Sequence, residues 1–239
     1  MVAKMAKTNT DPIGSKTTRT SWIVFFTSCI LYGFVMTALL FISAGRWDLP
    51  FFWAYIVIFS AYSIALPFAA GPELAKERMS PGPGGRDWFT RAAWIVLFFG
   101  QMVVAGLDVG RLHWGDSVPV ALQAVGLVGV VLAMAVWTWA IATNRFFSHL
   151  IRIQEDRGHV VITGGPYHYI RHPGYASFSL LLPCSALAFG SWVAMIPGVL
   201  LMLVIFRRAF LEDRILKNEL TGYREYSLEV PWRLVPGLW

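Results

Sequence analysis

Charged residues are scarce in this sequence. Only 14% of its 239 residues are Asp, Glu, Lys or Arg, whereas 56% are hydrophobic. A soluble domain carries roughly 25% charged residues, and here 20 basic and 14 acidic side chains would have to cover several long apolar helices. The scarcity argues against an ordinary soluble domain and indicates an integral membrane protein.

Two further absences narrow the chemistry. The only cysteines, Cys29 and Cys184, lie far apart in apolar runs, which excludes a disulfide framework or a cysteine-rich zinc site. We interpret both as small core residues. No glycine-rich strand-to-helix fingerprint occurs, which excludes a Rossmann-type nucleotide domain. The net charge of +6 does not indicate a nucleic-acid partner, because the basic residues flank apolar runs.

The apolar runs predict an all-α membrane protein with about six transmembrane or re-entrant helices. Four runs are expected to span the membrane, at residues 22–44, 50–70, 92–107 and 118–143. Two shorter runs, 175–190 and 192–206, flank Gly190-Ser191, a turn signal that predicts a helical hairpin. Each run of the hairpin holds a proline whose lost hydrogen bond must be compensated inside protein.

These segments predict three regions. We expect a cytosolic N-terminal tail (1–21), a four-helix membrane region (22–143), and a catalytic region with the hairpin, a cytosolic active-site cap and a cytosolic C-terminal tail (144–239). A Pro/Gly-rich loop is expected at 71–91. If the N-terminus is cytosolic, 18 of the 20 basic residues face the cytosol, and only Arg46 and Arg111 lie on the other side. The positive-inside rule then predicts cytosolic termini.

A polar, aromatic stretch, "GGPYHYIRHPGYAS", interrupts the apolar sequence at 164–177. Its double glycine and proline predict a turn, and Pro173 keeps His172 out of helical geometry. A helix that begins at this point directs its free N–H groups toward an anion such as a carboxylate. His168 and His172 have a metal-ligand spacing, but the proline that follows and the lack of Glu or Cys ligands argue against zinc, so no metal site is predicted.

A second polar cluster follows the hairpin and contains Arg207, Arg208, Glu212 and Asp213. Ordinary i,i+4 ion pairs, such as Arg208 with Glu212, are one interpretation, and they suffice for Lys217 and Glu219. The two acids are costly at this depth without partners. The hairpin should return them close to Arg171 and His172, which predicts one site at the cytosolic surface.

The ordered motifs "HVVITGGPYHYIRHPGY", "LEDRIL" and "GYREYSLEVPWRLVP" resemble the C-terminal half of the isoprenylcysteine carboxyl methyltransferase family, over about residues 152–236. The resemblance implies an S-adenosylmethionine-dependent methyltransferase with a cytosolic cofactor site. It implies Arg171 and Glu212 as catalytic residues. The cofactor-binding residues that it implies are His159, Val160, Val161, Gly165, Tyr167, His172, Pro173, Tyr175, Glu212 and Asp213.

The residue chemistry agrees with such a cofactor. A sulfonium cation is stabilised by carboxylates and aromatic faces, which Glu212, Asp213, Tyr167 and Tyr175 could supply. This chain has Ser177 and Asp213 where the family usually has Gly and Glu. The acceptor therefore stays open among a prenylcysteine carboxylate, an isoprenoid acid, a small thiol and a phospholipid amine, as an apolar or lipid-like molecule in contact with membrane lipids.

Two other classes of protein have sequence features in common with this chain. An NADPH-dependent sterol reductase has a similar C-terminal pattern, but within a larger membrane bundle than this chain provides. A non-enzymatic scaffold or transporter subunit should carry charges in the middle of its spans, and the predicted spans have almost none. A methyltransferase remains the leading interpretation.

Overall fold

The computed structural model describes residues 13–79 and 87–239, and within them it is helical without a strand. The α-helices are α1 (Ile13–Ala44), α2 (Pro50–Met79), α3 (Trp88–Leu107), α4 (Val120–Thr143), α5 (Pro173–Phe189), α6 (Met195–Glu219) and α7 (Tyr223–Glu229). A π-helical turn, η1 (Asp108–Leu112), and two 3-10 turns, η2 (Glu155–Arg157) and η3 (Gly165–His168), complete the described elements. The predicted all-α class is confirmed.

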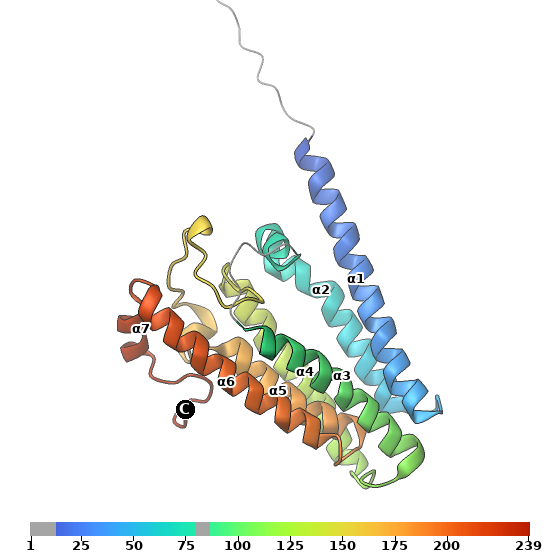
Figure 1. Cartoon of the computed structure of the whole chain (residues 1–239). Coiled ribbons are helices and arrows are strands. Elements are labelled where there is room, and N and C mark those ends of the chain that lie inside the picture. Colours follow the sequence, from blue (N-terminus) through green and yellow to red (C-terminus); the bar gives the residue numbers. More distant parts are fainter. Residues whose placement is uncertain (1–12, 80–86) are drawn as a thin grey trace, which may run out of the picture.

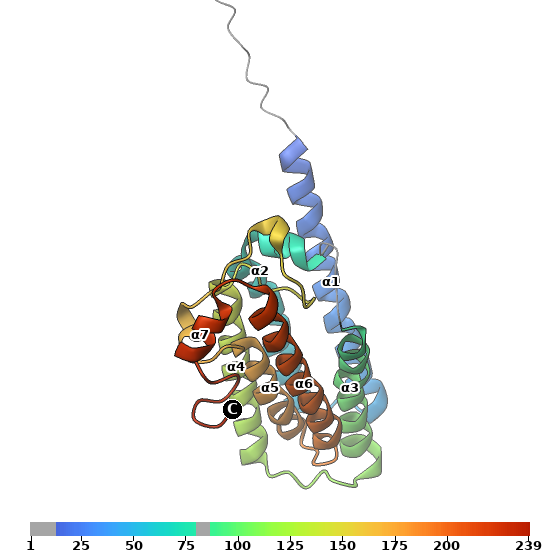
Figure 2. The same cartoon turned by 60° about the vertical axis from the view of Figure 1, so that its left-hand side comes forward.

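Helices α1 to α6 alternate in direction along one elongated bundle (Figure 1). The segment between α4 and α5, helix α7 and the C-terminal tail gather at one end, as the turned view also shows (Figure 2). The turns after α1, α3 and α5 lie at the opposite end. Since α5 packs against both α4 and α6, the hairpin places the end of α6 beside the segment that precedes α5.

Large aromatic side chains fill the centre of the bundle. Phe41, Phe52, Tyr55, Phe98 and Phe189 are almost completely buried. Close approach of α4 to α5 depends on Gly126, where a Cβ atom would lie 2.5 Å from the backbone nitrogen of Ala188. The hairpin turn forms as predicted, with Gly190 in the left-handed region at φ 80°.

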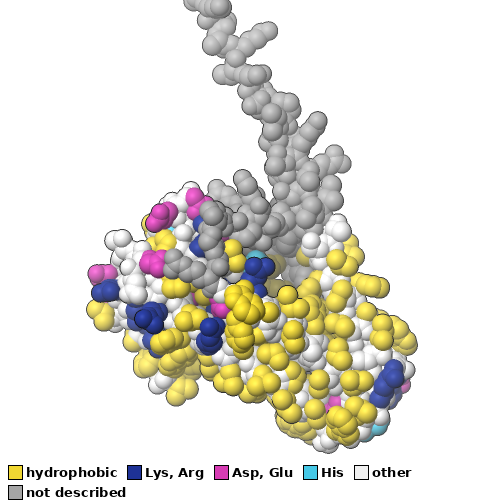
Figure 3. Space-filling view, viewed as in Figure 1, with side chains coloured by type: hydrophobic (Ala, Val, Ile, Leu, Met, Phe, Trp, Pro, Cys, Tyr) yellow, Lys and Arg dark blue, Asp and Glu magenta, His cyan; other side chains and the backbone are white. Residues whose placement is uncertain are grey.

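The face of the bundle seen in Figure 3 is largely apolar, and most of its charged side chains gather at the end that holds α7. Among the described residues, three helical segments are long and apolar enough to cross a membrane: Phe26–Ala44, Trp88–Leu112 and Val120–Thr143. Shorter apolar helices occupy Pro50–Leu66 and Pro173–Phe189. The chain is therefore an integral membrane protein, and the total of about six membrane helices stays a prediction.

Three predicted boundaries differ from the structure, and one of them belongs to helix α3, which begins at Trp88, inside the loop expected at 71–91. Helix α1 begins at Ile13, within the expected tail, the rest of which lies outside the described residues. Helix α2 continues to Met79, through the start of the expected loop. The strong helix formers of "ELAKERM" outweigh the preceding Gly71-Pro72, and Glu77 is buried in an ion pair with Arg152, Oε2 to Nη2 at 3.0 Å. Residues 80–86 of that loop lie outside the described part.

Candidate active site

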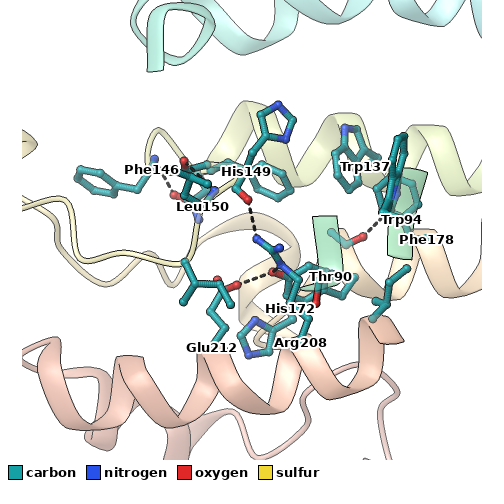
Figure 4. A pocket seen from close by; sticks show the side chains of 18 of the residues that line it. Thr90, Trp94, Trp137, Phe146, His149, Leu150, His172, Phe178, Arg208 and Glu212 are labelled. Carbon is teal, nitrogen blue, oxygen red and sulfur yellow. Dashed lines mark hydrogen bonds between the residues drawn. The ribbon is translucent and has the colours of Figure 1, made fainter. Parts of the chain in front are cut away.

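A cavity of about 800 Å³ joins the polar end of the molecule to the apolar bundle. Its polar part is lined by the segment between α4 and α5, by the start of α5, and by residues of α6 and α7. Its apolar part is lined by side chains of α1 to α6. Figure 4 shows both parts, with Arg208, His172 and Glu212 apart from the aromatic group of Trp94, Trp137 and Phe178.

Most of the predicted site residues line this one cavity. They are His159, Val160, Val161, Tyr167, Arg171, His172, Tyr175 and Glu212. Three others, Gly165, Pro173 and Asp213, are absent from its wall. The structure therefore brings most of the predicted residues together in one cavity wall, and the other three residues lie outside that wall.

Pro173 acts through the backbone. It occupies the first turn of α5, where its missing N–H is no loss. His172 before it is the N-cap, with φ −127° and ψ 63°, outside helical geometry as predicted. The N–H groups of Arg171 and His172 donate instead to the carbonyl oxygens of Trp232 and Arg233, each at 2.9 Å. This pairing with the C-terminal tail fixes both residues in the cavity wall.

Gly165 also acts through the backbone. Its φ is +57°, and an added Cβ atom would lie 2.6 Å from Thr143 Oγ1. The turn it permits leads directly to Tyr167, whose hydroxyl accepts a hydrogen bond from Asn144 Nδ2 at 3.1 Å. Burial raises the pKa of Tyr167 well above its usual range, so this hydroxyl stays neutral.

Glu212 and Arg208 meet at one hydroxyl group. Tyr175 donates to Glu212 Oε2 at 2.5 Å and accepts from Arg208 Nε at 2.7 Å. Arg208 Nη2 also donates to the carbonyl of His149 at 2.6 Å, which fastens α6 to the segment after α4. The i,i+4 pair considered for Arg208 and Glu212 is thus mediated by Tyr175, and all three residues line the cavity.

Asp213 is buried behind the cavity wall, with only 2% of its side chain exposed. Its Oδ1 lies near three residues that do line the cavity: Arg171 Nε at 2.7 Å, Tyr223 Oη at 3.1 Å and His172 Nε2 at 3.5 Å. Burial by itself would raise the pKa of Asp213, but His172 and Arg171 outweigh it and hold the pKa well below its usual range.

Lys217 is more than an ordinary helix-surface residue. Its Nζ lies 3.2 Å from Asp213 Oδ2, and Arg233 Nε lies 3.1 Å from the same oxygen. The i,i+4 spacing from Asp213 to Lys217 permits this contact. The i,i+4 ion pair expected for Lys217 therefore forms, and its partner Asp213 is buried.

His159 belongs to the segment between α4 and α5. Its Nδ1 accepts a hydrogen bond from the backbone N–H of Gln154 at 3.3 Å, and its ring lies 4.5 Å from that of Phe146. Burial lowers the pKa of His159 to about 4. The imidazole is neutral at physiological pH, so it adds a polar but uncharged surface to the cavity.

Several lining residues were not assigned to the site from the sequence. They are Asn144, Phe146, His149, Arg208, Tyr223 and Tyr226. The i,i+3 spacing of Tyr223 and Tyr226 places both on one helix face, which could have indicated that they face the site. In the structure, Tyr226 donates to the carbonyl of Tyr167 at 2.6 Å. Asn144 carries no comparable signal beyond its place after an apolar run. No group of three or more His, Cys, Asp or Glu within 13–79 and 87–239 is arranged to hold a metal ion.

Comparison with known proteins defines the class of the fold. Over 96% of this chain and 88% of the other, the structure resembles that of the eukaryotic intramembrane Ras methyltransferase ICMT, with a TM-score of 0.52 and 17% sequence identity. This likeness shows a shared fold. In sequence, residues 124–219 match the profile of the isoprenylcysteine carboxyl methyltransferase (ICMT) family. The resemblance predicted from the motifs is thereby confirmed.

Individual relatives match over shorter stretches. The chain is 32% identical over 132 residues to protein-S-isoprenylcysteine O-methyltransferase B of Arabidopsis thaliana, covering 51% of this chain and 60% of that protein. It is 44% identical over 55 residues to a probable protein-S-isoprenylcysteine O-methyltransferase of Oryza sativa subsp. indica, covering 23% and 29%. The chain thus spans less than two thirds of the length of these relatives.

Proposed function

We propose that this protein is an integral membrane S-adenosylmethionine-dependent methyltransferase that acts on an apolar or lipid-like acceptor with an anionic head group. The supporting observation is the single cavity that joins a charged, hydrogen-bonded wall to an aromatic-lined apolar part. A water-soluble donor and a lipid-like acceptor need such a junction, because their reacting atoms must meet where water is excluded.

The polar part fits the methyl donor. Glu212 supplies a carboxylate, and Tyr167 and Tyr175 supply aromatic faces, for a sulfonium cation. Arg171 and His172 supply polar contacts for the donor carboxylate. When bound, S-adenosylmethionine supplies an activated methyl group, and the contribution of these residues is to bind and orient it. Arg171 and Glu212 are our candidates for catalytic residues.

Arg208 favours an anionic acceptor. Its side chain lines the cavity with Thr90 and His172, between the polar wall and the aromatic group (Figure 4). A carboxylate or thiolate at this position would be attracted to its guanidinium group. Methyl transfer to such an anion would need no proton movement, because a carboxylate or thiolate already carries the electron pair that forms the new bond. A protonated amine would be repelled by this guanidinium group and would have to lose its proton to another group before it could accept the methyl group.

The apolar part fits the body of a lipid-like acceptor. It is lined by Tyr32, Phe59, Tyr62, Trp94, Phe98, Trp137 and Phe178. These side chains come from helices whose outer faces would contact lipid. The acceptor could therefore enter the cavity directly from the membrane. The excess of basic residues at the α7 end supports a cytosolic position for the polar part and for both termini.

Binding of S-adenosylhomocysteine to the purified, folded protein tests this proposal. A ligand that binds only the folded state at 100 times its Kd stabilises it by about 2.7 kcal/mol, so the thermal midpoint in detergent should rise. NADPH, tested in parallel, should have no effect. A shift with NADPH alone would favour the reductase, and no shift with millimolar S-adenosylhomocysteine would overturn the methyltransferase.

The acceptor is identified separately with a labelled methyl donor. Purified protein in lipid vesicles is offered prenylcysteine carboxylates, isoprenoid acids, lipid-soluble thiols and phospholipid amines. Label should enter an acceptor whose head group is an anion. Transfer to phospholipid amines alone would contradict the role given to Arg208.

A further inference from the structure

The carboxylate of Asp213 joins the cavity wall to side chains outside it. Oδ1 lies within 3.5 Å of Arg171, Tyr223 and His172, all of which line the cavity. Oδ2 lies within 3.2 Å of Lys217 and Arg233, neither of which lines it. Arg171 Nη2 also reaches Oδ2, at 3.3 Å. The orientation of this one group therefore depends on both sets of partners.

The tail segment 230–234 holds the same wall through its backbone. The carbonyl of Val230 accepts from Arg171 Nη1 at 2.7 Å, and the carbonyls of Trp232 and Arg233 accept from the N–H groups of Arg171 and His172. Arg171 and His172 are thus held on two sides, by Asp213 and by the tail. Both residues are buried.

Arg233 takes part in both sets of contacts. Its backbone carbonyl accepts from His172, while its Nε contacts Asp213 Oδ2 at 3.1 Å. Its guanidinium group lies over the rings of Phe210 and Trp239, at 5.7 and 5.2 Å from their centroids. These planar contacts orient Arg233 toward Asp213. Arg233 thus contacts the Arg171–His172 segment through its backbone and Asp213 through its side chain.

We propose that Arg233 is a positioning residue for the active site, which acts through Asp213 to hold Arg171 and His172 in the donor-binding wall. The identity of the bound donor rests on the proposed function, whereas the effect of Arg233 on the positions of Arg171 and His172 does not depend on it. Arg233 itself touches no bound substrate in this scheme. Its loss should loosen the donor-binding wall and leave the apolar part of the cavity unchanged.

Arg233→Gln tests the structural part by hydrogen exchange of the folded protein in detergent. The amides of Arg171 and His172 should exchange at least tenfold faster than in the unaltered protein. Arg224→Gln is the matched control, because it removes the same charge from the neighbouring helix α7, where Arg224 contacts Lys217 and Asn218 instead of Asp213. Unchanged exchange at residues 171 and 172 in Arg233→Gln would overturn the proposal.

Kinetics test the functional part. Arg233→Gln should raise the KM for S-adenosylmethionine and the Kd of S-adenosylhomocysteine by three- to tenfold, with little change in the acceptor KM. Arg233→Lys should recover part of the loss, since it restores a cation near Oδ2. Simple destabilisation of the tail would instead lower the active fraction and leave both KM values unchanged, which would contradict a positioning role. If the unaltered protein does not bind S-adenosylhomocysteine, the proposed function fails, while the exchange result still decides the role of Arg233.

Discussion

Arg171 and Asp213 form a paired hydrogen bond in the interior of the protein, Nε to Oδ1 at 2.7 Å and Nη2 to Oδ2 at 3.3 Å. Their side chains are only 3% and 2% exposed. Removing one partner of a buried ion pair leaves an uncompensated charge, which costs about 3–5 kcal/mol. The pair therefore locks α6 to the segment before α5 and gives Asp213 a positional role behind the wall that Arg171 forms.

Glu212→Gln should lower donor affinity or turnover about ten- to a hundredfold, because one charge-assisted contact contributes roughly 1.5–3 kcal/mol. The amide keeps the shape of the side chain and can still accept from Tyr175. The rate of methyl transfer and the KM for S-adenosylmethionine are the measurements, because S-adenosylmethionine carries the sulfonium charge that Glu212 is proposed to contact. Glu225→Gln, on the exposed face of α7, is the control and should change little. Near-normal transfer by Glu212→Gln would remove this residue from the site.

Ala133→Leu should raise the acceptor KM severalfold and leave the Kd of S-adenosylhomocysteine unchanged. Ala133 is buried on α4 and lines the cavity, so the added carbons would occupy space assigned to the acceptor. Ala135→Leu makes the same change on the exposed face of the same helix and serves as the control. An equal loss of donor and acceptor binding would argue against separate polar and apolar parts.

His159 should make stability depend on pH between about 6.5 and 4. Its pKa falls from an ordinary 6.5 to about 4 in the folded state because of burial. Within this window the unfolded chain binds a proton that the folded chain does not, so the free energy of unfolding decreases as the pH falls. The thermal midpoint in detergent measures this slope. His159→Asn cannot titrate, and an unchanged slope in that variant would contradict the assignment.

Gly126→Ala should destabilise the protein by about 1–3 kcal/mol, as overpacking does. The added Cβ would lie 2.5 Å from Ala188 N and 2.7 Å from Cys184 O, and these backbone atoms cannot rotate away. Gly100→Ala on α3 meets nothing within 4 Å. It should be neutral or stabilising by up to about 1 kcal/mol, since alanine favours a helix more than glycine does. Equal thermal midpoints for the two variants would contradict the close packing of α4 on α5.

A reporter fused after Trp239 that works only in the cytosol should be active, because the distribution of basic residues predicts that the C-terminal side of the protein lies in that compartment. A reporter that works only on the opposite side of the membrane serves as the control and should be silent. The reverse pattern would move the donor site away from the compartment that holds its soluble cofactor.

Features that depend on residues close together in the sequence could be predicted from it. Long apolar runs without charge specify membrane helices, Gly190 specifies the hairpin turn, and Pro173 specifies the start of α5. The hairpin then brought Arg171 and Asp213 together, as expected from two polar clusters at the ends of adjacent helices. The continuation of α2 past Gly71-Pro72 was not predicted. Glu77 in this part of α2 pairs with Arg152, which lies 75 residues further along the chain.

Only the tertiary structure decided what each polar side chain faces. The sequence treated Glu212 and Asp213 as a matched pair, but a step of one residue along a helix turns the side chain by about 100°. Glu212 consequently faces the cavity and Tyr175, while Asp213 points behind its wall toward Arg171, Lys217 and Arg233. Asn144 likewise belongs to the cavity wall because of a tertiary contact, its hydrogen bond to Tyr167, which lies 23 residues away in the sequence. Composition and local propensity determine which segments form helices. The residues that a side chain on such a helix contacts are determined only when the helices pack against one another.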